Sequence, residues 1–144
     1  MIISTGIYTR AVNSLSNDDV RVSRRLYVPS SRLRGFESGK VGPKDGDDHV
    51  GGNYVVTFNT SSTIPYVLQT QENMDLKLFF DAGNVWGVDY SSSLDDSDTI
   101  RSSTGVALEI TTPIGPLSFS FAQVLSKAST DKTESFKFQL GTTF

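Results

Sequence analysis

The chain has 144 residues, about the length of one domain. It carries 13 basic and 16 acidic residues, a net charge of -3, which excludes a nucleic-acid binder that depends on bulk positive charge. It contains no cysteine, so disulfide scaffolds, zinc ribbons and thiol enzymes are excluded. The small net charge and an aromatic content of 10% also argue against a disordered chain.

The beginning of the chain lacks the features of a secretory signal peptide. Its first residues, MIISTG, include no basic region, no apolar run and no cleavage site. No later run approaches the roughly 20 apolar residues of a membrane helix, although short strands that are only alternately apolar also cross membranes. If the remainder is typical of an exported protein, we expect the sequence to be a fragment or a processed piece.

Six stretches of the chain alternate apolar and polar residues with a period of two, which predicts β-strands. In chain order, the predicted strands cover residues 2–13, 53–60, 75–87, 100–112, 116–126 and 133–144, the first being weakly patterned. In the third stretch, Leu78 and Phe80 share one face, and Lys77 and Asp81 share the other. The sequence therefore predicts an all-β fold.

The length of these strands favours a membrane protein. They run for about ten residues, whereas strands of globular proteins average about 5–6 residues and membrane-spanning strands need about 9–11. Their second face is small and polar, as expected for the lumen of an antiparallel transmembrane β-barrel. A soluble β-sandwich or a secreted barrel remains the alternative on pattern alone.

The connections between the predicted strands differ greatly in length. Residues 112–116 form a tight Pro/Gly turn. Residues 13–52, called the long loop below, far exceed a hairpin connection, and such loops are usually functional or disordered. We expect the long loop to lie on one side of the sheet with residues 88–99 and 126–132, and the tight turn on the other side. Six strands are too few for a closed barrel, so we expect two open sheet edges.

The long loop and the third strand each carry one residue of a predicted ion pair. Arg34 lies in the loop, and Asp81 lies on the polar face of the strand. A carboxylate in a lumen requires a cationic partner, and arginine offers two parallel hydrogen-bond donors. We predict that the loop folds back into the lumen and brings Arg34 to Asp81; the alternative is two unrelated solvated charges.

The last predicted strand has a clear apolar face. We expect Phe136, Phe138, Leu140 and Phe144 to face lipid, and Lys137, Gln139 and Gly141 to face the lumen. Trp86 and Tyr90, near the end of the third strand, are typical of an aromatic belt at a membrane interface, with ordinary packing as the alternative.

Taken together, these motifs resemble the carboxy-terminal part of BamA, the outer-membrane-protein assembly factor family of Gram-negative bacteria. Leu33-Arg-Gly-Phe36 is similar to the family's Val-Arg-Gly-Phe/Tyr motif at the tip of the sixth extracellular loop. Phe79, Asp81 and Gly83 match its Phe-x-Asp-x-Gly strand motif, and the chain ends on an aromatic residue, Phe144. The glycine-rich stretch 39–53 is also typical of this family, and the resemblance covers nearly the whole chain.

The resemblance implies that residues 1–144 form the carboxy-terminal six-strand part of an antiparallel transmembrane β-barrel, with a long loop that enters the lumen. The POTRA domains and the first ten strands of the family are absent from the sequence. It also implies two groups of site residues. The loop-to-wall motif comprises Arg34, Gly35, Phe36, Phe79, Asp81 and Gly83. The carboxy-terminal strand signal comprises Phe136, Phe138, Leu140, Gly141 and Phe144.

The implied function is the folding and insertion of β-barrel proteins into the bacterial outer membrane. The implied partners are outer-membrane lipid, nascent β-barrel substrate proteins and the accessory lipoproteins of the assembly complex. We expect no enzyme activity, no catalytic residue, no cofactor and no metal, because the implied mechanism needs no covalent chemistry. His49 is the only histidine, and nothing in the sequence places serine and aspartate partners beside it.

Three alternatives stay open at this point. The first is a secretion pore of the two-partner type, in which the same loop motif occurs. The second is a barrel that anchors a patatin-like lipase, which would make the full protein an enzyme. The third is a soluble β-binding module, which would not depend on detergent.

Overall fold

The computed structural model describes residues 1–15, 24–29, 31–64, 73–88, 99–129 and 131–140. These residues form a six-stranded sheet in which each strand lies beside its neighbours in the chain, in the order β1-β4-β5-β6-β7-β8. The strands are β1 (Ile2–Ala11), β4 (Tyr54–Ile64), β5 (Met74–Trp86), β6 (Arg101–Thr112), β7 (Gly115–Ser126) and β8 (Phe136–Leu140). A small hairpin of β2 (Lys44–Asp45) and β3 (Asp48–His49) lies within the long loop.

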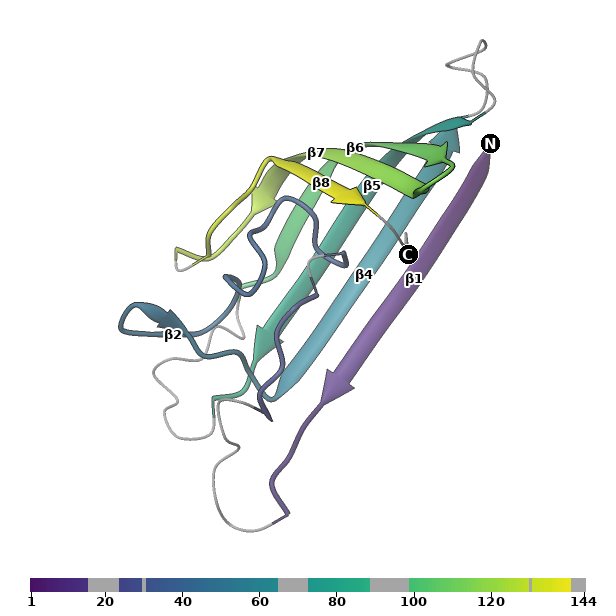
Figure 1. Cartoon of the computed structure of the whole chain (residues 1–144). Helices are drawn as coiled ribbons and strands as arrows, with labels where there is room; N and C mark the ends of the chain where they lie inside the picture. Colours follow the sequence, from purple (N-terminus) through teal and green to yellow (C-terminus); the bar gives the residue numbers. More distant parts are fainter. Residues whose placement is uncertain (16–23, 30, 65–72, 89–98, 130, 141–144) are drawn as a thin grey trace.

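Every neighbouring pair of strands in the large sheet is antiparallel, as predicted. The β6–β7 turn is tight, because Thr112 pairs with Gly115 and only Pro113 and Ile114 lie between them. Gly115 has a φ of 125°, a conformation that side chains with a Cβ rarely adopt. This turn and the long loop lie at opposite ends of the strands (Figure 1). Among the described residues, no helix is long and apolar enough to cross a membrane.

Three predicted strand boundaries were wrong by two residues or more. β1 ends at Ala11 and not at residue 13. β4 continues to Ile64, four residues beyond the prediction of 53–60, because its polar end is paired on both sides: Ser61 lies opposite Ser4 of β1 and Phe79 of β5. β8 starts at Phe136 rather than at residue 133, since the preceding segment pairs with the long loop. Residues 141–144 of the predicted last strand lie outside the described residues.

The sheet is curved, and residues 24–29 and 31–41 of the long loop lie on its concave side (Figure 1). The loop packs apolar side chains against the sheet, and this contact forms the main hydrophobic core. The buried core residues are Leu26, Val28, Leu33, Phe36 and Val41 of the loop, with Val55 of β4 and Val85 of β5. The core therefore lies between the loop and the concave face.

The opposite, convex face exposes large apolar side chains along every strand from β4 to β8. These are Tyr54, Val56, Phe58, Leu78, Phe80, Val106, Phe121, Leu125, Phe136, Phe138 and Leu140. A soluble protein rarely exposes a continuous apolar surface of this kind. It matches the lipid-facing side of a membrane barrel, where outward residues are apolar and inward residues are polar.

Candidate functional site

The tip of the long loop, residues 32–36, is joined to β5 by an ion pair between Arg34 and Asp81. Arg34 Nε lies 2.7 Å from Asp81 Oδ2, and Arg34 Nη2 lies 2.8 Å from Asp81 Oδ1. The backbone amide of Arg34 also donates to Asp81 Oδ2, at 3.1 Å. Asp81 is fully buried, whereas 20% of the Arg34 side chain is exposed. The predicted contact is thus present, with the fork geometry that makes arginine–carboxylate pairs strong.

Side chains of three strands make further contacts with Arg34 and Asp81. Asn59 of β4 donates from Nδ2 to Asp81 Oδ1 at 2.9 Å, so the carboxylate accepts hydrogen bonds at both oxygens from two different elements. The Arg34 guanidinium lies 3.7 Å from the ring centroid of Phe79, a cation–π contact that also shields the charge from water. Ser103 of β6 donates its hydroxyl to the carbonyl oxygen of Arg34.

Gly35 and Phe36 let the loop tip approach the sheet. Gly35 has a φ of 92°, and a Cβ there would lie 3.0 Å from the Cβ of Ala122 on β7. Only glycine fits that backbone conformation and that spacing together. Phe36 is almost completely buried in the main core, and its backbone pairs with Thr133.

Contacts of the loop tip extend across most of the sheet. Arg32 places its guanidinium 5.1 Å from the ring of Tyr8 on β1 and accepts a hydrogen bond at its carbonyl oxygen from Asn59 of β4. Arg34 reaches β5 and β6, and Gly35 reaches β7. Five adjacent strands therefore share one short loop segment, which constrains the curvature of the sheet.

The remaining predicted residues fall into three groups. Gly83 lies on the concave face of β5, where a Cβ would approach the side chain of Thr57 to 3.0 Å and the backbone oxygen of Val56 to 3.1 Å. Phe136, Phe138 and Leu140 of β8 are exposed on the convex face. Gly141 and Phe144 lie outside the described residues, as does Tyr90.

Trp86, at the end of β5, stacks on Tyr54 of β4 with ring centroids 5.8 Å apart. Lys137 and Gln139 of β8 line the concave side, as the alternation predicted.

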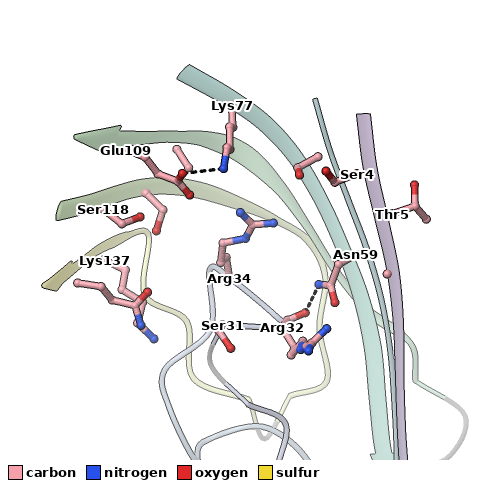
Figure 2. A pocket seen from close by; sticks show the side chains of 15 residues that line it. Ser4, Thr5, Ser31, Arg32, Arg34, Asn59, Lys77, Glu109, Ser118 and Lys137 are labelled. Carbon is pink, nitrogen blue, oxygen red and sulfur yellow. Dashed lines mark hydrogen bonds and ion pairs between the residues drawn. The ribbon is translucent and has the colours of Figure 1, made fainter. Parts of the chain in front are cut away.

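Between the loop tip and the concave face is a polar cavity of about 250 Å³. Figure 2 shows Arg34 pointing from the loop tip toward the sheet, with the ion pair of Lys77 and Glu109 on the sheet wall. Lys77 Nζ lies 2.6 Å from Glu109 Oε2, and both side chains are about one quarter exposed. The cavity is therefore lined by small polar groups, by the ion pair of Lys77 and Glu109, and by the longer side chains of Arg32, Arg34, Lys137 and Gln139. Within the described residues, His, Asp and Glu form no group of three that could hold a metal ion.

A further ion pair, between Arg101 of β6 and Asp131, was missed by the sequence analysis, as was that of Lys77 and Glu109. Arg101 Nε lies 2.8 Å from Asp131 Oδ2, and both side chains are fully buried. Arg101 shows in the sequence as a polar-face residue at a strand start, and Asp131 as one of several polar residues in a short loop. No spacing rule connects the two, so only the fold could reveal the pair.

Comparison with known proteins identifies similar chains. The model of the Omp85 superfamily domain matches residues 1–144. The chain is 30% identical over 132 residues to the outer membrane protein assembly factor BamA of Neorickettsia risticii, covering 90% of this chain and 18% of the relative. It is 32% identical over 139 residues to BamA of Neisseria meningitidis, covering 78% and 17% of the two chains. The chain thus spans less than a fifth of these relatives.

Solved structures give the same result for the fold. The crystal structure of BamA from Haemophilus ducreyi lacking POTRA domains 1–3 superimposes with a TM-score of 0.85 at 30% identity. The superposition covers 94% of this chain and 30% of that chain. The chain therefore has the fold of about one third of that structure.

Proposed function

Because the chain belongs to the Omp85 superfamily, we propose that it forms the carboxy-terminal six strands of an outer-membrane barrel that folds and inserts other β-barrel proteins. In this proposal, POTRA domains and ten further strands belong to the full protein. The two unpaired edges of the described sheet, on β1 and β8, are where those strands and a substrate would attach. An outer-membrane location fits the apolar convex face, which suits contact with lipid.

The observation that carries the proposal is the pair of Arg34 and Asp81. It joins the two motifs on which the sequence resemblance to assembly factors rests, and it holds the loop tip against the concave face of the sheet. Burying an aspartate costs free energy unless its hydrogen bonds are fully met. A fully buried carboxylate with donors on both oxygens is therefore an arrangement built to hold the loop in one position.

The mechanism requires no covalent step. A free strand edge offers backbone donors and acceptors in register, and an incoming strand can pair with it by β-augmentation. In hydrocarbon, every backbone polar group needs a partner, so pairing at such an edge would favour insertion of the new strand. In this scheme β8 supplies the edge, the long loop braces the concave face, and the chain has no enzymatic role.

The proposed partners follow from the same surfaces. Outer-membrane lipid would contact the convex face, and nascent β-barrel proteins would pair at the open edge. Accessory lipoproteins of the assembly complex would bind the full protein. The terminal residues Gly141 and Phe144, with Phe136, Phe138 and Leu140, would form the carboxy-terminal strand signal by which this barrel is itself assembled.

The test is depletion of the full-length protein in its own bacterium, followed by re-expression of the wild-type protein or its Asp81→Arg variant. We expect depletion to lower the amount of folded β-barrel proteins of many kinds in the outer membrane, measured by heat-modifiable electrophoresis. The wild-type protein should restore them and the Asp81→Arg variant should not, because a second cation would face Arg34. Unchanged barrel levels after depletion would contradict the proposal.

The same depletion separates the alternatives. Loss of one secreted protein with normal barrel levels would identify a secretion pore of the two-partner type. Loss of surface ester hydrolysis with normal barrel levels would identify a lipase anchor. Cell fractionation tests the third alternative: recovery of the protein in the soluble fraction without detergent would identify a soluble binding module.

A further inference from the structure

The buried pair of Arg101 and Asp131 links three separate parts of the chain. Asp131 follows β7, Arg101 begins β6, and Asp131 Oδ1 also accepts a hydrogen bond from the backbone amide of Gly42 in the long loop, at 3.0 Å. Arg101 Nη1 donates to the side chain of Asn84 on β5 and to the carbonyl oxygen of Thr99. The pair thus ties the sheet, the long loop and the segment that leads into β8.

Asp131 is surrounded by donors on both carboxylate oxygens. Oδ1 accepts from Gly42 N at 3.0 Å and from Arg101 Nη2 at 3.2 Å. Oδ2 accepts from Arg101 Nε at 2.8 Å and from Ala128 N at 2.7 Å. An asparagine of the same shape would have to point its NH₂ group at one of these pairs of donors. The site therefore requires a carboxylate and not merely a polar side chain of that size.

The residues after Asp131 pair with the long loop through their backbone. Lys132 donates to Lys40 O at 3.0 Å and accepts from Glu37 N at 3.0 Å. Glu134 N donates to Gly35 O at 2.9 Å. Ser135 O then accepts from Ala122 N at 2.8 Å, and β8 begins at the next residue. The segment from Asp131 to Ser135 is thus fixed on one side by the loop before it joins the sheet as β8.

We propose that Arg101 and Asp131 are positioning residues that set the start of β8, and through it the free sheet edge, against the long loop. This inference rests on the proposed function, because it concerns the edge at which a substrate strand would pair. Within the described part of the chain, β8 pairs with β7 from Phe136 to Leu140, and the segment from Asp131 to Ser135 leads directly into the first of these pairs. Breaking the pair frees the segment from the loop while the Arg34–Asp81 pair stays intact.

The experiment uses the full-length protein reconstituted in lipid nanodiscs and follows amide hydrogen exchange residue by residue. In the Asp131→Asn variant we expect exchange at Lys132, Glu134 and residues 136–140 to be about tenfold faster, since local opening sets these rates. The amide of Arg34, which donates to Asp81, serves as an internal reference and should change less than about twofold.

Glu109→Gln is the matched control, because it removes one charge of a different ion pair on the concave face, between Glu109 of β6 and Lys77 of β5. It should leave exchange in residues 131–140 unchanged. Arg101→Lys is the second variant, to be used if Asp131→Asn does not assemble. It keeps the charge but loses the fork, and it should give the same local pattern with a smaller amplitude.

Unchanged exchange in residues 131–140 would overturn the proposal, and so would a uniform rise that includes the Arg34 amide. The proposed function is tested separately, by the barrel-protein levels of the depletion assay. Normal rescue by wild-type protein with unchanged exchange in the variant would reject the positioning role alone. If re-expression of the wild-type protein does not change barrel levels, the proposed function is rejected. The exchange experiment would still show whether Arg101 and Asp131 hold the start of β8.

Discussion

Arg34 meets Asp81 with three of its nitrogen atoms: its backbone amide, Nε and Nη2 all donate to the same buried carboxylate. Because the backbone takes part, the pair fixes the path of the loop as well as the orientation of the side chain. A longer or shorter cation at position 34 could match the charge but not this geometry. The loop tip is thereby held at one place on the concave face.

We predict that Asp81→Asn releases the loop tip. Asn59 and Arg34 supply four donors to the two oxygens of Asp81, so an amide NH₂ group would oppose one pair of them. Breaking a buried ion pair from one side costs about 3–5 kcal/mol. Limited proteolysis of the full-length protein in detergent should show faster cleavage within the long loop. The control Glu109→Gln, in a partly exposed pair, should cost only about 0–1 kcal/mol and leave cleavage unchanged.

Reversal of both charges should rescue only in part. Arg34→Asp or Asp81→Arg alone places two like charges together, and we expect each to lower the folded barrel fraction. The double variant restores attraction, but the backbone amide at position 34 loses its acceptor and Asn59 loses the oxygen to which it donates. A double-mutant cycle on the folded fraction measures the coupling free energy. A coupling near zero would show that the two charges do not act as a pair.

We expect Gly35→Ala to weaken loop docking more than Gly39→Ala. Both glycines have positive φ, so both variants share the cost of the left-handed backbone, about 1–2 kcal/mol. At Gly35 the added Cβ also meets Ala122 at 3.0 Å, whereas at Gly39 it meets nothing within 4 Å. The extra overpacking should add about 1–3 kcal/mol. Thermal unfolding of the full-length protein in detergent compares the two; equal losses would refute the close approach.

The orientation of β8 predicts a labelling pattern. The chain has no cysteine of its own, so single cysteines introduced by Lys137→Cys and Phe138→Cys report on one position each. Lys137 lines the polar cavity and Phe138 is exposed on the convex face. In liposomes, a water-soluble maleimide should label the first variant and not the second. A fluorophore attached at position 138 should be quenched by brominated lipid, and the opposite pattern would mean that the register is shifted by one residue.

The isolated 144-residue chain should not be a soluble monomer. Its convex face exposes aromatic and aliphatic side chains, and the described sheet ends in the unpaired strands β1 and β8. Both features drive association in water. Light scattering after removal of detergent should show aggregates, whereas a folded monomer in detergent-free buffer would contradict the membrane assignment.

The period-two pattern was enough to predict the antiparallel sheet and which face of each strand is apolar. Phe80 and Phe138 are on the convex face and Asp81 and Lys137 are on the concave face, because alternation is a local property of an extended chain. The predicted end of β4 was wrong because pairing with the neighbouring strands continues the strand beyond its alternating apolar and polar residues. Ser61 extends β4 because both of its neighbouring strands pair with it.

The ion pairs Arg34–Asp81 and Arg101–Asp131 show what can and what cannot be predicted from the sequence. Arg34 and Asp81 could be paired in advance because each belongs to a short motif and each charge needs a partner on the same face. Arg101 and Asp131 belong to no such motif, and their contact depends on the long loop presenting the Gly42 amide beside them. Alternation and motif content were thus determined by the sequence itself, since they depend on neighbouring residues. The meeting of a loop, a strand start and the segment before β8 was decided only by the tertiary structure, because long-range packing brings together residues whose spacing carries no signal.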